Sequence, residues 1–222
     1  MTSKNWASFI FVSALASACS DNGGNVTIRG AGTTDGLSAV NPTQMMLKIY
    51  KVAVSASTNC SSPITLFSND NPSYTNFLGN PTLGSGELAD GTYPCVIFEI
   101  SDNLKFIPET TEGVCTAGEE YLIDICRTDS TGSSTLVDGT VSTCTGSNDG
   151  GGRVIGEDRI AIYLSTGGTD EGQAFSPGDP ITLGSAFVVA GSTRGTFVVN
   201  GMGQVDGSGV DCDMGAPNFS FQ

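Results

Sequence analysis

The fold class is decided by the ten residues 92–101, which read Thr-Tyr-Pro-Cys-Val-Ile-Phe-Glu-Ile-Ser. Val96, Phe98 and Ile100 recur at every second position, so they lie on one face of an extended strand. β-branched and aromatic residues, which pack well on a pleated surface, dominate this stretch. The pattern predicts a central β-strand with an apolar face turned toward a core.

Shorter candidates of the same kind lie on both sides of this strand. In the segment 45–55 the apolar alternation changes phase around Tyr50-Lys51, which predicts a β-bulge. Gly-containing turn signals such as Asp138-Gly139 and Asn200-Gly201 separate the candidates. Further strands are predicted over 63–67, 74–78, 104–107, 121–126, 134–141, 159–165, 181–190, 196–200 and 218–221.

No stretch of helical length shows a clean 3.6-residue period. Many short strands joined by turns predict an all-β fold, an antiparallel β-sandwich of Greek-key or transthyretin-like topology. The Gly-rich segment 145–152 could divide the chain into two halves, but we interpret it as a surface loop of a single domain over 27–222. Ser101-Asp102-Asn103 is interpreted as a polar turn after the central strand.

The N-terminus has the layout of an export signal. Lys4 precedes an apolar stretch over 6–15 that is too short to span a bilayer as a helix. Leu15-Ala16-Ser17-Ala18 then leads directly to Cys19, an arrangement that resembles a bacterial lipoprotein signal. The resemblance implies a signal peptide over 1–18, a lipidated Cys19 and a tether over 19–26. The alternative is ordinary secretion, because Ala16-Ser17-Ala18 is also a small-residue cleavage site.

A second resemblance lies in the body of the chain. The turn Leu88-Ala89-Asp90-Gly91-Thr92-Tyr93, together with the segments 47–54, 187–191 and 196–200, is similar to uncharacterised bacterial lipoproteins with a β-sandwich domain. An L-x-x-G-x-Y turn also recurs in unrelated transthyretin-like sandwiches. This resemblance implies a β-sandwich fold and a surface location, and it implies no active site. The lipoprotein-type signal implies a palmitate-type acyl anchor in the cell envelope, and Ser20 after the cysteine implies the outer membrane where the cell has one.

Cysteine arithmetic agrees with export. Setting Cys19 aside from the seven cysteines leaves an even set, which predicts three disulfide bonds. No C-x-x-C pair points to zinc. Six cysteines allow 15 pairings, of which we favour Cys60 with Cys95 because the central strand should lie beside the first. The set consists of Cys60, Cys95, Cys115, Cys126, Cys144 and Cys212.

The charge balance excludes several classes of partner. Nine Lys and Arg against 23 Asp and Glu give a formal net charge of −14. Such a surface excludes nucleic acid and disfavours peripheral binding to anionic lipid, so the lipid chains must attach the protein to the membrane. The chain has no histidine, which removes the commonest general base and the commonest metal ligand.

One oxygen-rich loop is a candidate cation site. Asp206, Asp211 and Asp213 lie within a Gly-rich segment, and calcium prefers several oxygen ligands from such a bent loop. The alternative is an acidic loop held by a disulfide at Cys212. No other cofactor is expected.

These patterns favour a non-catalytic binding or interaction domain of the envelope, with a protein or a glycan as its ligand. One alternative is a glycan hydrolase that depends on carboxylates, for which pairs such as Glu119-Glu120 and Glu157-Asp158 offer candidates. Another is a subunit of a surface fibre, suggested by the alternating strand over 218–221.

Overall fold

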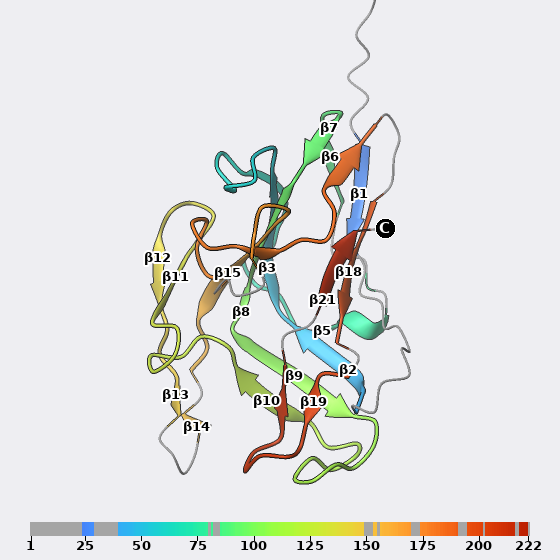
Figure 1. Ribbon diagram of the computed structural model, residues 1–222, viewed down its shortest axis with the longest axis vertical. Helices are drawn as coiled ribbons and strands as arrows, with labels where there is room; N and C mark the ends of the chain where they lie inside the picture. Colours follow the sequence, from blue (N-terminus) through green and yellow to red (C-terminus); the bar gives the residue numbers. More distant parts are fainter. Residues whose placement is uncertain are drawn as a thin grey trace, which may run out of the picture.

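The computed structural model describes residues 24–28, 40–79, 81, 85–148, 153–154, 156–169, 174–190, 195–201, 203–215 and 218–221. These residues form an all-β, disulfide-bonded fold (Figure 1). The only helical element among them is a single 3-10 turn, Phe77–Gly79. Within the described ranges no helix has the length and hydropathy to cross a membrane.

The predicted central strand is confirmed as the middle of a five-stranded sheet. The strand begins at Cys95, because Pro94 separates it from a short strand, β7 (Gly91–Tyr93). All contacts in this sheet are antiparallel except the one between its first two strands. The order is β16 (Ile181–Thr182), β15 (Arg159–Ser165), β8 (Cys95–Ser101), β3 (Ile49–Ser55) and β4 (Ile64–Ser68).

Two strands of this sheet continue directly into a second sheet. Lys48 separates β3 from β2 (Pro42–Leu47), and Asp102 separates β8 from β9 (Asn103–Pro108). The second sheet is antiparallel and has the order β10 (Tyr121–Asp124), β9, β2 and β5 (Thr75–Asn76). The predicted bulge is confirmed, since the β3–β8 register shifts between Ile49 and Lys51.

A third sheet contains both ends of the described chain. Its order is β21 (Asn218–Phe221), β18 (Gly195–Asn200), β1 (Gly24–Ile28) and β6 (Ser85–Leu88). β1 is parallel to β18 and antiparallel to β6. Residues 24–26 of the expected tether therefore pair within a sheet. Residues 1–23, which include the expected signal and Cys19, lie outside the described residues.

Four short ladders complete the fold. β7 pairs with β17 (Phe187–Val189), β11 (Ser133–Thr135) with β12 (Val141–Thr143), β13 (Ser147–Asn148) with β14 (Arg153–Val154), and β19 (Val205–Asp206) with β20 (Asp213–Met214).

Two of the predicted strands are wrong as continuous elements. The segment 134–141 instead spans the β11–β12 hairpin, which turns at the predicted Asp138-Gly139, where Gly139 has a φ of 85°. The segment 181–190 contains β16 and β17, separated by residues 183–186. In the segment 74–78 a two-residue strand runs into the 3-10 turn.

The core uses both faces of β8. Val96, Phe98 and Ile100 belong to the main core cluster, as the alternation predicts. Cys95 and Ile97 on the opposite face belong to a second, smaller cluster, which the loop residues Leu136 and Val137 cover. All seven residues of β8 are buried. The main cluster also includes residues before and after the segment 145–152, so the described parts of the chain share one core.

The L-x-x-G-x-Y turn forms a tyrosine corner. The hydroxyl of Tyr93 donates a hydrogen bond to the carbonyl of Ala89 at 2.9 Å. Its ring packs near that of Phe187, with centroids 6.4 Å apart. The ring also lies over Gly91, where an added Cβ would be 3.8 Å from it. The motif thus fixes the angle at which β7 enters the central strand.

Candidate functional site

The six cysteines after Cys19 form three pairs, as predicted. Cys60 pairs with Cys95 across a Cα–Cα distance of 5.4 Å, which confirms the favoured pairing. The other pairs, Cys115–Cys212 and Cys126–Cys144, have Cα–Cα distances of 4.8 and 5.2 Å. These are ordinary separations for disulfide bonds.

The Cys115–Cys212 bond joins two acidic loops, 109–120 and 206–213, at one end of the molecule. The N–H of Val114 donates to the carbonyl of Gly207 at 3.0 Å. A Cβ on Gly207 would lie 1.7 Å from the carbonyl oxygen of Glu112, so only glycine fits this crossing. The alternative to a calcium site, an acidic loop held by a disulfide, is therefore present in the structure.

The three carboxylates of the expected calcium site do not converge. Asp206 accepts the N–H of Ser208 at 2.8 Å, and Asp213 accepts the N–H of Met214 at 2.9 Å, while Asp211 is exposed. Each of the first two carboxylates thus faces its own backbone. Among the described residues, no group of three or more His, Cys, Asp or Glu side chains is arranged to hold a metal ion.

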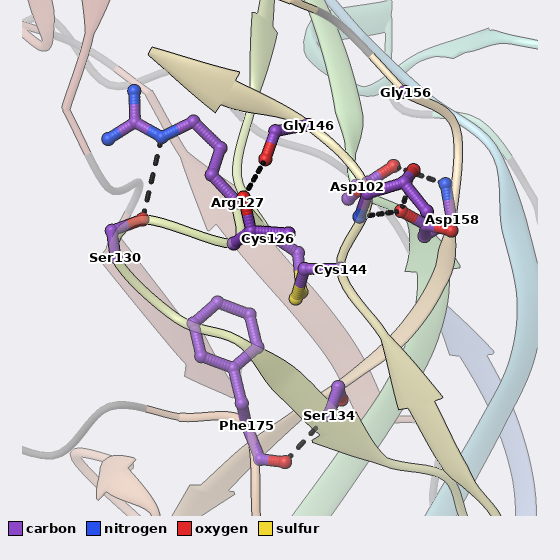
Figure 2. Close-up of a disulfide and its surroundings, with 12 residues drawn as sticks. Asp102, Cys126, Arg127, Ser130, Ser134, Cys144, Gly146, Gly156, Asp158 and Phe175 are labelled. Carbon is purple, nitrogen blue, oxygen red and sulfur yellow. Dashed lines mark hydrogen bonds between the residues drawn. A yellow bond between two sulfur atoms is a disulfide. The ribbon is translucent and has the colours of Figure 1, made fainter. Parts of the chain in front are cut away.

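A cluster of buried carboxylates lies where β8 passes into β9. Asp102 is completely buried, and Asp124 at the end of β10 is 4% exposed. Asp102 Oδ1 accepts the N–H of Asp158 at 2.8 Å, and the N–H of Asp102 donates back to the Asp158 carbonyl at 3.0 Å (Figure 2). Ser101-Asp102-Asn103, interpreted from the sequence as a polar turn after the central strand, is a buried junction between β8 and β9.

The other carboxylates of this cluster are held by backbone groups. Asp124 accepts the N–H groups of Cys126 at 3.1 Å and Gly156 at 3.3 Å. Asp158 accepts both the N–H and the hydroxyl of Thr145, at 2.7 and 2.6 Å. The cluster therefore ties the start of β15 to the Cys126–Cys144 region.

The surroundings of Asp102 and Asp124 favour a proton on Asp102. Burial, together with the Asp124 and Asp158 carboxylates, raises the pKa of Asp102 to about 7, against the lowering effect of the Asp158 N–H. Burial also raises the pKa of Asp124. Asp102 Oδ2 is buried and accepts no hydrogen bond from the described residues. A proton on Asp102, donated to Asp124, satisfies this oxygen and removes the repulsion between the two groups.

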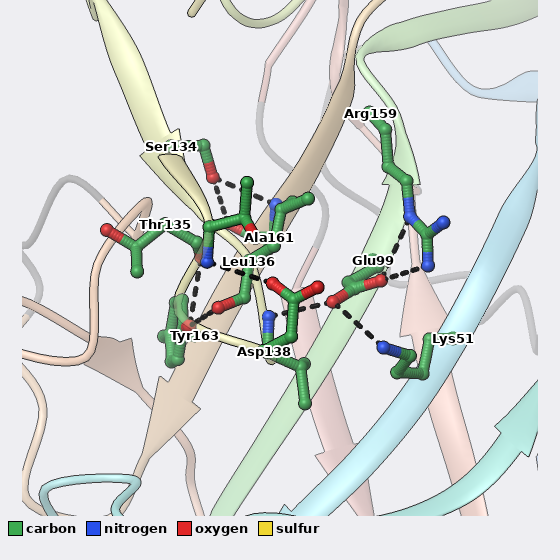
Figure 3. Close-up of polar contacts among 11 residues, drawn as sticks. Lys51, Glu99, Ser134, Thr135, Leu136, Asp138, Arg159, Ala161 and Tyr163 are labelled. Carbon is green, nitrogen blue, oxygen red and sulfur yellow. Dashed lines mark hydrogen bonds and ion pairs between the residues drawn. The ribbon is translucent and has the colours of Figure 1, made fainter. Parts of the chain in front are cut away.

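A second buried charge lies on the outer face of the five-stranded sheet. Glu99, 1% exposed, is in the centre of β8. Its carboxylate accepts hydrogen bonds from Arg159, with Nε at 2.9 Å, and forms an ion pair with Lys51 at 3.5 Å (Figure 3). It also accepts the N–H of Val137 at 2.7 Å. One carboxylate thus neutralises two cations and holds the β11–β12 loop on the sheet.

Tyr163 lies beside this cluster. Its hydroxyl donates to the carbonyl of Thr135 at 2.9 Å. Burial raises its pKa to about 12, with further contributions from Glu99 and Asp138. A phenol with this pKa remains protonated at neutral pH, so Tyr163 acts as a hydrogen-bond donor that attaches the hairpin to the sheet.

Neither buried cluster has the properties of an active site. A general acid must reach a substrate atom directly or through one water molecule. Asp102, Asp124 and Glu99 instead face backbone N–H groups and neighbouring side chains in the interior. Of the surface pairs named from the sequence, Glu120 forms an ion pair with Lys105, and Glu157 forms an ion pair with Lys48.

In comparisons with protein families, curated proteins and solved structures, the chain has no significant match.

Proposed function

We propose that the protein is a lipid-anchored component of a bacterial cell envelope whose β-sandwich is a non-catalytic binding domain. The observation that carries this proposal is the pairing of the last six of its seven cysteines. These pairs leave Cys19, directly after the apolar segment, as the odd cysteine. Three disulfides favour an oxidising compartment, and there an odd cysteine in this context suits covalent lipidation.

The buried clusters support a role in binding rather than catalysis. The carboxyl groups of Glu99, Asp102 and Asp124 are buried in the interior, and their contacts fix loops to the sheets. Such a framework presents loops rigidly, which suits recognition of a protein or a glycan.

Mass spectrometry of the native N-terminal peptide tests the anchor. The expected result is a mature chain that begins at Cys19 and carries two or three acyl chains. The Cys19→Ala variant, with the same signal segment, should carry none. An unmodified Cys19, or a membrane-bound chain that retains residues 1–18, contradicts the proposal.

A hydrolase assay tests the non-catalytic assignment. Incubation of the purified protein with peptidoglycan fragments and a panel of oligosaccharides should release no new reducing ends. Release that is lost in Glu120→Gln or Glu157→Gln, with the fold retained, would favour the carboxylate-dependent glycan hydrolase instead.

One observation favours the fibre alternative. β21 is at the edge of its sheet and, among the described strands, pairs only with β18 of the same chain. An edge strand can pair with another chain. Light scattering at rising protein concentration distinguishes the two functions. The measured mass of a binding domain should stay constant, whereas that of a fibre subunit should increase as the subunits assemble.

A further inference from the structure

The two ends of the long axis are built from different loops (Figure 1). We define the proximal end as the loops 56–63, 89–90 and 166–169, and the distal end as the disulfide-linked loops 109–120 and 206–213. Sheet register places the proximal loops together, because Ser55 and Ser165 are both partners of Cys95. The Cys60–Cys95 bond holds the first of these loops at that end.

The start of β1 is also at the proximal end. Gly24 pairs with Leu88, the residue immediately before the 89–90 turn. β1 is an inner strand, between β18 and β6, so its direction is fixed by neighbours on both sides. Cys19 precedes Gly24 by five residues, and a chain of five residues spans at most about 18 Å when fully extended. A lipid on Cys19 therefore has to lie close to the proximal end.

The two ends differ sharply in charge. The loops 56–63 and 166–169 contain only Ala, Ser, Thr, Asn, Cys, Pro and Gly. Asp90 is the single charged residue in the three proximal loops as defined, and Asp170 and Glu171 follow them directly in the sequence. The distal loops contain four Glu and three Asp, which makes seven carboxylates, and they contain no Lys or Arg. In a chain of net charge −14, the end nearest to Cys19 therefore has fewer carboxylates than the distal end.

Exposed apolar side chains accompany the proximal loops. Ile64, directly after the 56–63 loop, is 45% exposed, and Val188, opposite Thr92 in the β7–β17 ladder, is 55% exposed. The distal end also exposes Val114 and Val210, but these stand among the carboxylates. The proximal loops therefore combine exposed apolar side chains with mostly neutral polar groups, the composition that suits the membrane interface.

We propose that the domain stands on the membrane with its proximal end against the lipid headgroups and its distal end directed away. This inference rests on the lipid anchor at Cys19 proposed above. An anionic headgroup layer repels carboxylates within a Debye length of about 8 Å at physiological ionic strength. The proximal end has fewer carboxylates and therefore meets less of this repulsion, and its hydroxyl and amide groups can hydrogen-bond to headgroups. The acidic, disulfide-linked loops are then the part presented to a partner.

Two matched alanine positions test the orientation. Ala89 and Ala117 are both exposed, one at each end. Full-length acylated Ala89→Cys and Ala117→Cys proteins are labelled with one fluorophore and placed in vesicles of phosphatidylethanolamine and phosphatidylglycerol with a headgroup-attached spin-label quencher. Quenching should be at least about twofold stronger at position 89, since quenching falls steeply with distance from the headgroups. Equal quenching, or stronger quenching at position 117, overturns the proposal.

A second pair of positions protects the test against misfolded variants. Thr92 and Thr116 are exposed at the same two ends, and Thr92→Cys and Thr116→Cys should repeat the order. The acyl mass at Cys19 is measured on each sample first. A missing acyl group contradicts the proposed anchor, whereas an acylated protein with reversed quenching contradicts the orientation alone.

A charge added at the proximal end gives an independent readout. Val188→Glu should weaken quenching at position 89, whereas the matched Val210→Glu at the distal end should leave it unchanged. An equal effect of both substitutions overturns the assignment of Val188 to the membrane-facing surface.

Discussion

Glu99 Oε1 accepts the backbone N–H of Val137 at 2.7 Å, which connects the centre of β8 with the turn of the β11–β12 hairpin, 38 residues away. The same carboxylate neutralises Lys51 and Arg159. The hairpin in turn covers the outer face of β8 with Leu136 and Val137. A charge in the middle of an apolar strand therefore stabilises the packing of a loop that Ser134 and Tyr163 also attach to the sheet.

The first prediction concerns this carboxylate. Glu99→Gln keeps an acceptor for Val137 but leaves two cations without a counter-charge. Breaking a buried pair costs about 3–5 kcal/mol, and we expect a loss near the lower limit because Lys51 and Arg159 can reach water. Urea unfolding measures this loss.

Glu120→Gln is the matched control, since it removes the partner of Lys105 in an exposed pair. Its effect should be below about 1 kcal/mol. The assignment of Glu99 is contradicted if both substitutions lower the free energy of unfolding by the same amount.

The second prediction is a dependence of stability on pH that originates at Asp102. Its pKa is raised from 3.8 to about 7 in the fold, so the folded state holds a proton that the unfolded state has released. The stabilising contribution is complete below pH 3.8 and is lost as the pH rises through 7. Asp102→Asn stays neutral and can still donate to Asp124, so its stability relative to the wild type should increase between pH 4 and pH 8.

Asp138→Asn is a control whose effect on stability should depend on pH in the opposite direction. The N–H and hydroxyl of Thr140 lower the pKa of this exposed carboxyl. Its contribution is therefore present above its unfolded-state pKa and is lost as the pH falls. Unfolding curves at several pH values compare the three proteins, and parallel curves for wild type and Asp102→Asn would contradict a proton on Asp102.

Much of the β framework could be predicted from local patterns. The segments 159–165 and 218–221 are strands with the predicted limits, and the phase change at Tyr50-Lys51 marks a real bulge. Alternation and turn residues depend on neighbours in sequence, so these features can be predicted from the sequence alone. The strand β1, with the sequence Gly-Asn-Val-Thr-Ile, has a weak pattern of its own and is defined by its partners on both sides.

The buried charges could not be predicted in the same way. Glu99 occupies the polar phase of an alternating strand, which usually indicates a solvent-facing position. Asp102 follows a strand, where a polar residue usually indicates a turn. Both are buried because segments distant in sequence, the loop at Val137 and the segment at Asp158, cover them. The sequence signal that could predict a buried Asp102 is its position directly between two apolar strands.

The third prediction concerns the tyrosine corner. Tyr93→Phe keeps the ring beside Phe187 and removes the hydrogen bond to Ala89, which should cost about 1 kcal/mol. Tyr93→Ala also removes the buried ring and should cost about 3–5 kcal/mol. Thermal and urea unfolding of both variants separate the two contributions. A Tyr93→Phe protein as stable as the wild type would show that the hydroxyl bond makes no net contribution.

The fourth prediction concerns calcium. Because Asp206 and Asp213 face their own backbone N–H groups, millimolar calcium should leave the melting temperature equal to that in chelator. Asp211→Asn should behave in the same way. A calcium-dependent rise that Asp211→Asn abolishes would instead establish the loop 206–213 as a site that forms on binding.

The last prediction ranks the three disulfide bonds. A cross-link stabilises mainly by restricting the unfolded chain, and the effect grows with the length of the loop that it closes. The sequence separations are 97 for Cys115–Cys212, 35 for Cys60–Cys95 and 18 for Cys126–Cys144. The chain-entropy relation gives about 4.7, 3.8 and 3.2 kcal/mol for these bonds. Removing each bond by a double Cys→Ala substitution should lower the free energy of unfolding in this order.

The position of each bond sharpens this test. Cys115–Cys212 joins two loops at the distal end, so its removal should also speed amide exchange at Val114, whose N–H bonds to Gly207. Removal of Cys60–Cys95 at the other end should leave this exchange unchanged under conditions where both variants remain folded. Thiol counting in denaturant should find no free thiol in the wild type other than any at Cys19. Two or more free thiols among the six later cysteines would contradict the pairing on which the ranking depends.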